Sequence, residues 1–329
     1  ADSFIALAAR ENLSATPVAV VTDTGRMKML FKGRAIVDIS REFLNTNGVK
    51  QTADAEICDR VTDWFDKKTG TDFVKETKKA LSDLNVCAKK GLSETFDSTI
   101  GARSVYMPWG GRNQLTPAIA MAAKICGDET DVCTVSAYGY SPYLMETSPF
   151  VGTIYSIVAS VSKVVATGAR YEDIRLTLQE FFERMTSDKK VWGVPASALL
   201  GAVYAQIGLS LGAIGGKDSM SGTFEHIHVP PTLISFALAP ANASRLISNV
   251  LKGGEKVWRL PVPKDGQYVP DFEKLKAVYR EVYKNIANGN ITFATVAENG
   301  GAGAAVVKSA LGNGVGFGFV QSADELYTE

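Results

Sequence analysis

Histidine is nearly absent from this sequence, and its scarcity excludes several kinds of catalytic site. His226 and His228 are the only two among 329 residues. A zinc site or a nucleophilic triad that relies on several imidazoles therefore lacks the side chains it needs. The two histidines alternate in the segment HIHVPP and would share one face of a strand. Two ligands without a third are nevertheless typical of a solvated surface.

Cysteine is also sparse. The chain has four, none of them in a CxxC pair: Cys58, Cys87, Cys126 and Cys133. Such usage in a long chain favours free thiols in a reducing compartment, so we expect a cytoplasmic protein. A loop closed by a Cys126–Cys133 disulfide is the alternative. No cysteine occurs with a histidine and an acid in a glutaminase or protease pattern, so we do not expect this chain to hydrolyse glutamine.

An excess of charge of either sign is missing as well. Thirty-five Lys and Arg residues balance 35 Asp and Glu residues, for a formal net charge of zero. A nucleic-acid binder carries a basic excess, so nucleic acid is not an expected partner. The hydrophobic fraction of 46% and the charged fraction of 21% are typical of a globular chain and argue against intrinsic disorder. A chain of this length is expected to form two domains, or one domain with flanking pieces.

Charged residues are absent from one long stretch, Val191 to Gly216. Residues 196–214 within it are nearly long enough to span a bilayer. The stretch contains Gln206, serines and several glycines, and its flanks are poor interface anchors. No basic region followed by an apolar one is visible at the start of the sequence, as a secretion signal would require. We therefore expect a buried helix that packs on a sheet, and no membrane partner.

Strand and helix patterns alternate along the chain and predict an α/β or α+β fold with helices packed against sheets. A first helix (3–11) precedes two strands (18–23 and 26–39) that form a hairpin around Thr24-Gly25, followed by a polar linker (45–56). Further helices are expected at 59–65, 72–82, 152–167 (ending at Gly168), 176–184, 196–211, 243–251, 272–288 and 303–311. Further extended segments are expected at 104–109, 131–144 (a strand running into a loop), 232–239 (ending at Pro240), 256–262 and 291–297.

The segment 214–224, IGGKDSMSGTF, has the residue types of a phosphate-binding loop. Two glycines allow a ligand to approach main-chain N–H groups, a lysine offers a charge for phosphate, an aspartate offers a hard oxygen for Mg²⁺, and serines donate hydrogen bonds. The residues are Gly215, Gly216, Lys217, Asp218, Ser219 and Ser221. It is not a Walker A loop, because Leu211 and Asp218 stand where that motif needs glycine and Ser or Thr. A glycine turn with a solvated Lys-Asp pair is the alternative.

Three other polar segments carry weaker signals. In residues 96–102, Asp97 is flanked by hydroxyls and glycine, which suits either a metal carboxylate or the N-cap of a short helix. Residues 109–117 (WGGRNQLTP) form a donor-rich loop or a simple turn between strands. Residues 297–303 (AENGGAG) open a helix, where glycines provide either an anion site or a structural turn.

Taken together and in order, several segments resemble phosphoribosylformylglycinamidine synthase, a purine-pathway enzyme family also called formylglycinamide ribonucleotide amidotransferase. The segments are LNVCAKKGL, FDSTIGA, WGGRNQLTP, SAYGYSP, GGKDSMSGTF, VPPTLISFALAP and ALGNGVGFG. The resemblance covers essentially the whole chain and is closest to the long single-chain form of gut-type anaerobic bacteria. It implies aminoimidazole-ribonucleotide-synthetase-like domains arranged as a pseudodimer of two halves.

The resemblance also implies how the chain is divided. Residues 1–48 would be the tail of a preceding C-terminal domain, 49–240 an N-terminal α/β domain, and 241–329 the start of the next C-terminal domain. The family converts formylglycinamide ribonucleotide and glutamine to the formylglycinamidine ribonucleotide at the expense of ATP. This chain would be its auxiliary nucleotide-binding half, inactive alone, whose partners are the missing catalytic half and glutaminase domain of the same parent chain. The catalytic residues are unassigned.

Site residues follow from the resemblance one position at a time. Asp97 and Asp218 match metal-binding aspartates, and the phosphate loop for ATP or ADP with Mg²⁺ comprises Gly215, Gly216, Lys217, Ser219 and Ser221. The sequence departs from the family on the helix at 152–167, where Ala159 and Lys163 replace a Glu and an Asn that face the metals at i, i+4. We therefore expect a weakened or metal-free auxiliary site, in which the lysine amine could take the place of the metal.

Two alternatives remain from the sequence. The chain could be a free-standing nucleotide-binding or dimerisation module of the same superfamily. It could also be another member, such as a selenophosphate synthetase or a thiamine-monophosphate kinase, but the N-terminal glycine-rich metal-binding segment that such a protein needs is not found.

Overall fold

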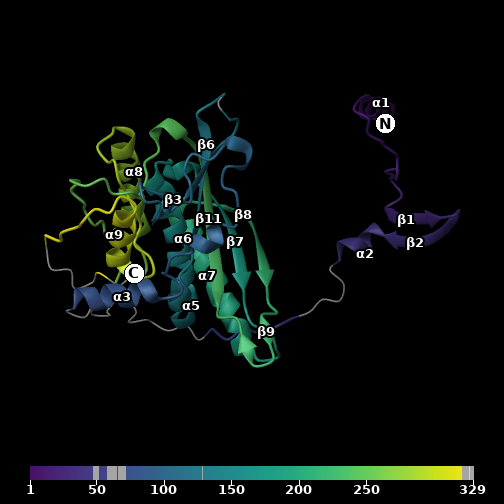
Figure 1. The fold of residues 1–329 in the computed structure, drawn as a ribbon. Coiled ribbons are helices and arrows are strands. Elements are labelled where there is room, and N and C mark those ends of the chain that lie inside the picture. The colour runs from purple at the N-terminus through teal and green to yellow at the C-terminus, as the bar shows by residue number, and fades with distance from the viewer. Residues whose placement is uncertain (47–51, 58–64, 66–71, 128, 321–325, 327–329) are drawn as a thin grey trace. The chain divides into compact units, whose positions relative to one another are not determined.

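The computed structural model describes residues 1–46, 52–57, 65, 72–127, 129–320 and 326, and it divides the chain into two compact units, Ala1–Ala53 and Asp54–Glu329 (Figure 1). The domain boundary predicted after residue 48 lies outside the described residues. The boundary predicted after residue 240 falls inside a strand that runs from Thr232 to Asn242. The division at 48 and 240 therefore stays a prediction.

The first unit contains a helix, a hairpin and a short helix. They are α1 (Asp2–Arg10), β1 (Arg26–Phe31), β2 (Arg34–Ser40) and α2 (Arg41–Asn45). The expected first helix is confirmed, but the hairpin expected around Thr24-Gly25 is wrong because residues 18–22 form no strand. The chain turns instead at Lys32-Gly33, where φ is 48° and 77°. Two successive positive φ values match the right-handed twist of the flanking strands, which makes this the favoured two-residue turn.

The second unit is built on a five-stranded mixed sheet. Its order is β5-β6-β11-β7-β8, and every neighbouring pair is antiparallel except β7 and β8, which are parallel. The strands are β5 (Met121–Lys124), β6 (Val132–Gly139), β7 (Arg175–Phe181), β8 (Ala213–Ser219) and β11 (Thr232–Asn242). Along β11 the buried residues Leu233, Ser235, Ala237 and Ala239 alternate with more exposed ones. One face of the sheet is therefore packed and the other is open to solvent within the described residues.

The packed face is covered by α6 (Pro149–Thr167), and α7 (Lys189–Leu209) lies against α6 (Figure 1). Ser148 caps α6 by accepting a hydrogen bond from the Val151 N–H, and Gly168 ends it at φ 110°. Both helices are long and apolar enough to cross a membrane by length and composition alone. In α6, 78% of the apolar window is buried, which identifies a core helix; in α7 the share is 39%. The expected helices at 152–167 and 196–211 are thus confirmed, but the second packs mainly on α6 rather than on the sheet and is only partly buried.

The remaining elements surround this core. Helices lie at α3 (Phe73–Ser82), α4 (Lys90–Ser93), α5 (Pro142–Thr147), α8 (Phe272–Ala287) and α9 (Gly301–Leu311), with short 3₁₀ turns at Ile100–Ala102, Tyr171–Asp173 and Ala243–Arg245. Two small hairpins pair β3 (Trp109–Gly110) with β4 (Thr116–Pro117), and β9 (Thr223–Phe224) with β10 (Ile227–His228). The helices expected at 72–82, 272–288 and 303–311 are confirmed. Except for Phe65, the helix expected at 59–65 lies outside the described residues.

Two sequence expectations fail within the sheet. Residues 176–184, expected as a helix, include most of strand β7, because Leu176 and Phe182 are buried at even spacing and the backbone pairs with β11 and β8. Strand β11, expected to end at Pro240, continues to Asn242. Beyond Leu238 the register pairs β11 only with β6, an edge position where proline is tolerated.

Three further expectations fail in the C-terminal part. Residues 243–251 form a 3₁₀ turn and then extended chain, because their backbone N–H groups bond elsewhere: Ile247 donates to Thr167 and Leu251 to Ser309. Residues 256–262 and 291–297 form no strand. In the first of these segments, Trp258 is 82% exposed. Alternating apolar residues do not form a β-strand unless a neighbouring strand is there to pair with them.

Candidate functional site

The segment predicted to bind phosphate is an edge strand rather than a loop. Most of it belongs to β8, the outermost strand of the described sheet, where the backbone pairs with β7 on one side. The Gln179 side chain donates to the Lys217 carbonyl at 2.7 Å, and Thr177 donates to the Gly215 carbonyl at 3.2 Å. The residues from Gly215 to Asp218 are exposed. Lys217 donates a hydrogen bond to Ser219, so both side chains lie together at the sheet edge.

A buried carboxyl group lies next to this strand and was missed from the sequence. Glu180 of β7 is 6% exposed and stands beside Asp218 in the parallel register. Burial, together with the negative charge of Asp218, raises the pKa of Glu180 to about 7. The even spacing of Leu176, Leu178 and Glu180 is the sequence signal that could have placed this side chain inside, but only once residues 175–181 are taken as a strand.

Asp97 lies in an exposed turn that it organises itself. Its carboxylate accepts hydrogen bonds from the Thr99 N–H at 2.8 Å and the Thr99 hydroxyl at 2.6 Å. These two hydrogen bonds hold the pKa of Asp97 below its ordinary value. Asp97 is not the N-cap of the following 3₁₀ turn Ile100–Ala102, because Thr99 occupies that position and its side chain makes no capping hydrogen bond, so the capping alternative for Asp97 is wrong.

The residues expected to hold a metal do not gather into a metal site. Over the described part of the chain, no group of three or more His, Cys, Asp or Glu side chains is placed to hold an ion. The metal roles of Asp97 and Asp218 therefore stay predictions. His228 lies 2.9 Å from the Glu183 carboxylate and His226 is exposed, so the pair gains no third ligand from the described residues.

The cysteines are free where the structure describes them. Cys87, Cys126 and Cys133 form no disulfide, so the Cys126–Cys133 alternative is wrong. Cys58 lies outside the described residues. Cys133 is buried in β6 and its pKa is raised by burial, whereas Cys126 is exposed.

Lys163 stands at the helix position where the resemblance expects a metal ligand, and among the described residues it is one of the most buried that carry a charge. It is 3% exposed, and its Nζ lies 2.7 Å from Oε1 of Glu298 and donates to the Tyr138 carbonyl at 2.8 Å. The same ammonium lies 4.4 Å from the centre of the Tyr138 ring. One turn earlier on α6, Ala159 lies next to Gly139 of β6, where a Cβ on the glycine would come within 3.0 Å of the Ala159 Cβ. The lysine thus joins α6, β6 and the segment that precedes α9.

Helix α9 begins at the glycine-rich segment as expected. Gly300 and Gly301 adopt φ of 90° and 65°, and the Gly301 N–H donates to the Glu298 carbonyl at 2.6 Å. Lys308 lies farther along α9, and its pKa is lowered, first by burial and also by the charges of Lys89 and Lys163, while Glu298 opposes the shift. Glu298 thus contacts the Lys163 ammonium and also acts electrostatically on Lys308.

The donor-rich segment 109–117 packs against the turn that follows α9. Its Arg112 N–H donates to the Asn313 side chain at 2.9 Å, and the Asn113 N–H donates to the Gly312 carbonyl at 2.7 Å. Gly111 has φ 85°, and a Cβ there would come within 2.3 Å of the Gly312 backbone. These glycines serve turn geometry and close packing, as the simpler interpretation of the segment expected.

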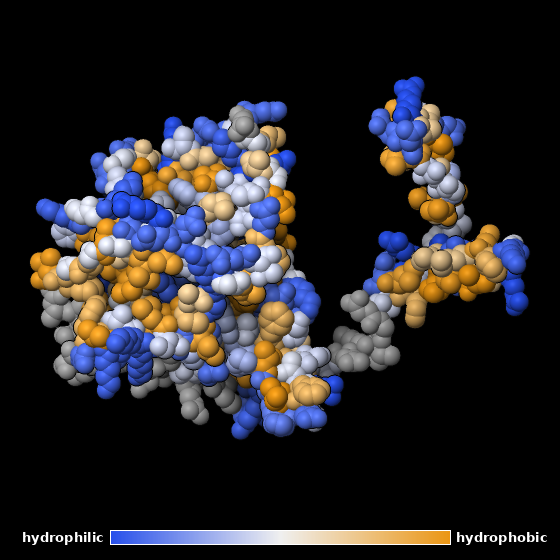
Figure 2. Space-filling view, viewed as in Figure 1, coloured by the Kyte–Doolittle hydropathy of each residue, from blue (hydrophilic) through white to orange (hydrophobic). Residues whose placement is uncertain are grey.

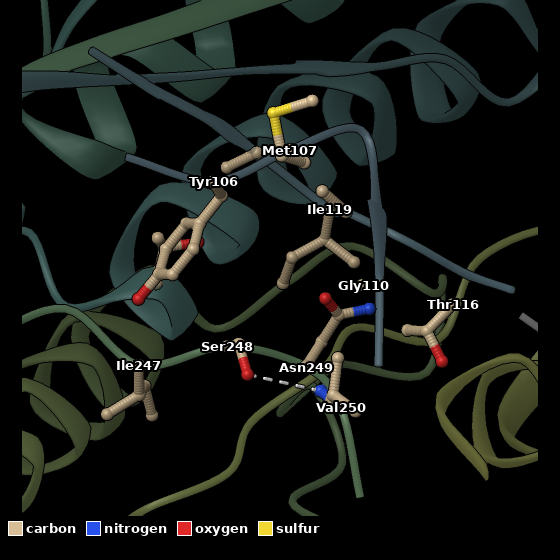
Figure 3. Close-up of a pocket in the computed structure, with 12 residues that line it drawn as sticks. Tyr106, Met107, Gly110, Thr116, Ile119, Ile247, Ser248, Asn249 and Val250 are labelled. Carbon is tan, nitrogen blue, oxygen red and sulfur yellow. Dashed lines mark hydrogen bonds between the residues drawn. The ribbon is translucent and has the colours of Figure 1, made fainter. Parts of the chain in front are cut away.

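A pocket elsewhere in this unit contains none of the predicted site residues (Figure 3). Tyr106, Met107 and Ile119 line it together with residues 247–250. Asn249, one of its polar residues, donates to the Pro117 carbonyl at 2.9 Å. The lining includes no charged side chain, so the pocket lacks the cations that a phosphate group needs.

Comparison with known proteins identifies distant relatives. The sequence matches no family model. Phosphoribosylformylglycinamidine synthase subunit PurL of Thermoplasma acidophilum is 25% identical over 167 residues, which is 50% of this chain and 22% of that protein. This chain is therefore a distant relative of PurL.

The fold also matches part of solved PurL structures. The structure of Thermotoga maritima PurL complexed with ATP has a TM-score of 0.59 at 15% identity and covers 88% of this chain and 42% of that one. The PurLQS structure from Thermotoga maritima has a TM-score of 0.61 at 15% identity and covers 87% and 42%. The expected mixed α/β fold is confirmed. The chain spans less than half the length of these structures and about a fifth of the length of the sequence relative.

Proposed function

We propose that this chain is one half of the synthetase region of an ATP-dependent amidotransferase in de novo purine biosynthesis. That enzyme converts formylglycinamide ribonucleotide and glutamine to formylglycinamidine ribonucleotide. The observation that carries the proposal is the fold match, in which nearly the whole chain corresponds to 42% of PurL. Of these relatives, Thermotoga maritima PurL has been determined in complex with ATP and with FGAR. In our proposal this chain supplies the auxiliary nucleotide-binding half in the cytoplasm.

The open face of the sheet supports the proposal that this chain packs against a partner half. Phe236 and Leu238, on the central strand β11, are 41% and 46% exposed, and Met121 of β5 is 61% exposed. The register places Leu238 and Met121 on either side of Ser136, so these apolar residues share one face. Figure 2 shows that apolar residues reach the surface of this unit. A contiguous apolar face on a water-soluble domain marks an interface, and the catalytic half of the same parent chain is the partner we propose for it.

The edge strand β8 supports the nucleotide role. Gly215 and Gly216 bring exposed main chain to the outer edge of the sheet, and Lys217 with Ser219 adds a charge and a hydroxyl. Together with Ser221 they offer the donors that a polyphosphate accepts. Adenosine triphosphate or diphosphate is the ligand that we propose for this edge.

We infer that the amide nitrogen comes from outside this chain. A glutaminase needs a thiolate activated by a neighbouring base. Of the cysteines that the structure describes, Cys87 is contacted by Lys89, at 3.3 Å, and Cys133 is buried with a raised pKa. Neither arrangement supplies a cysteine–histidine pair. We therefore propose that a glutaminase domain elsewhere in the parent chain supplies ammonia.

One assay tests the proposal as a whole. ATP hydrolysis is measured with formylglycinamide ribonucleotide and either ammonia or glutamine, using this chain alone, and nucleotide binding is measured by calorimetry. We expect nucleotide binding without turnover, because the catalytic half is missing. Turnover by this chain alone would overturn the assignment as an auxiliary half, and absence of nucleotide binding would refute the nucleotide role.

A free-standing dimerisation module is the alternative, and the same open sheet face favours it. The two proposals differ in what covers that face, a second copy or a different half. Sedimentation of the full chain, with Leu238→Glu as a variant of the face, measures this. A stable dimer that the substitution dissociates favours the module, whereas a monomer favours the auxiliary half.

A further inference from the structure

The family resemblance of the sequence implies metal ligands at positions 159 and 163 of helix α6. Mg²⁺ requires near-octahedral oxygen ligands, usually carboxylates. In this chain Ala159 offers none, and Lys163 offers a cation. The nearest described carboxylate is that of Glu298, and the Lys163 ammonium already contacts it. The residues present therefore do not fit a magnesium ion at this position.

The surroundings of Lys163 instead satisfy an ammonium group. Its Nζ contacts Glu298 at 2.7 Å and the Tyr138 carbonyl at 2.8 Å, and the Tyr138 ring lies 4.4 Å away. A carboxylate, a carbonyl and an aromatic face are all groups that attract a cation. They come from β6 and from the segment before α9, whereas the lysine belongs to α6. One side chain therefore bridges three separate parts of the fold.

The charges nearby oppose a second cation. The charges of Lys89 and Lys163 both lower the pKa of Lys308, while the charge of Glu298 opposes the shift. Lys163 is buried and Lys308 is half-buried, so repulsion between their like charges is less screened than it would be in water. A divalent ion placed here would meet these charges without a free carboxylate to offset them.

We propose that the Lys163 ammonium is a built-in replacement for a divalent cation, tying α6 and β6 to the start of α9. The folding of the second unit is then independent of Mg²⁺. Resting on the proposed function, the same inference says that nucleotide binding by this chain does not require Mg²⁺ at this position.

Thermal unfolding of the full chain tests the structural part. The melting temperature of the unaltered chain is measured in EDTA and in millimolar Mg²⁺, and the two values should agree. Lys163→Met keeps the apolar stem but leaves Glu298 without its contact, so the melting temperature should fall by about 10 °C. Adding Glu298→Gln to that variant should recover part of the loss, because the unpaired carboxylate is removed. Lys284→Met, at an exposed pair 3.9 Å from Glu281, is the matched control and should leave it unchanged.

The results separate the two proposals. A melting temperature of the unaltered chain that rises with Mg²⁺ or falls in EDTA would overturn the replacement of the metal by Lys163, as would a Lys163→Met variant as stable as the parent. If Lys163→Met does not fold, Lys163→Arg provides the second variant, and its partial retention of stability is expected. Calorimetric titration of ADP in EDTA and in Mg²⁺ should give affinities within twofold. Absence of ADP binding in both conditions refutes the proposed nucleotide function, while the unfolding data still decide the role of Lys163.

Discussion

Two regions of the second unit carry residues that resemble parts of a nucleotide site, and they differ in burial and in partners. At the junction of α6 and α9, Lys163 is 3% exposed and contacts a carboxylate, a carbonyl and a ring. At the β8 edge, Gly215, Gly216 and Lys217 are exposed and reach solvent. In the first region the charged group already has protein partners, whereas the second region has exposed groups available for a ligand. Charged groups enclosed by their own partners serve structure, and accessible ones are free to serve binding.

Removing one lysine from each region tests most directly whether the two regions differ in their contribution to stability. Lys163→Met should lower the free energy of unfolding by about 2–4 kcal/mol, because it removes a buried ammonium group from its contacts with Glu298 and the Tyr138 carbonyl. Lys217→Met, on the exposed edge, should change it by less than about 0.5 kcal/mol. Urea denaturation of both variants measures the difference. Equal losses in the two variants would contradict the distinction between the regions.

A matched pair of glycines tests the same contrast through packing. A Cβ at Gly139 would come within 2.0 Å of the Ser156 carbonyl, where β6 crosses α6, whereas a Cβ at Gly215 meets nothing within 4 Å. Gly139→Ala should destabilise the fold by about 1–3 kcal/mol, since the backbone must shift. Gly215→Ala should be neutral to within about 0.5 kcal/mol. The two midpoints in urea give the result, and a neutral Gly139→Ala would show that α6 and β6 are less closely packed than described.

The buried acid beside β8 predicts a pH dependence. The pKa of Glu180 is raised from 4.5 to about 7, so the folded state binds its proton more tightly than the unfolded state. Its contribution is full below about pH 4.5 and is lost as the pH rises through about 7. The free energy of unfolding should therefore decline between about pH 4.5 and pH 8. Glu180→Gln should reduce this decline by about 2 kcal/mol and make the chain more stable than its parent at pH 8. Unfolding measured from pH 5 to 8 tests this, with Glu281→Gln on an exposed surface as control.

The smallest expected effect concerns affinity at the β8 edge. Lys217→Met should weaken ADP binding about tenfold, because one charge contact to phosphate is worth about 1–2 kcal/mol. Calorimetry measures this, and Lys284→Met provides the control. An unchanged affinity in Lys217→Met would show that this lysine does not contact the phosphates and would contradict its proposed role.

Sequence patterns predicted the long helices well and the sheet less well. The helix at 152–167 was recognisable because its apolar residues recur at three and four and Gly168 stops it, signals that do not depend on distant residues. The strand at 175–181 was predicted as a helix, because only its pairing with β11 and β8 decides between the two periods. The strand predicted to end at Pro240 continues for the same reason. Whether a proline is tolerated at this position depends on where β7 stops pairing with β11, which the local sequence does not show.

The candidate site divides in the same way. The glycines and Lys217 of residues 214–221 were predicted to form a phosphate-binding loop, whereas they form an exposed edge strand whose conformation depends on pairing with β7. The substitution at Lys163 was visible in the sequence, whereas its partners were not, because Tyr138 and Glu298 are distant along the chain. Glu180 was missed altogether, since its burial follows from the strand that was predicted as a helix.

The central claim is that this chain is a nucleotide-binding half whose Lys163 replaces a metal. Titration of ADP into the full chain, once in EDTA and once in Mg²⁺, tests it most directly. The account predicts binding in both conditions with affinities that agree within twofold. Binding that appears only with Mg²⁺ would contradict it.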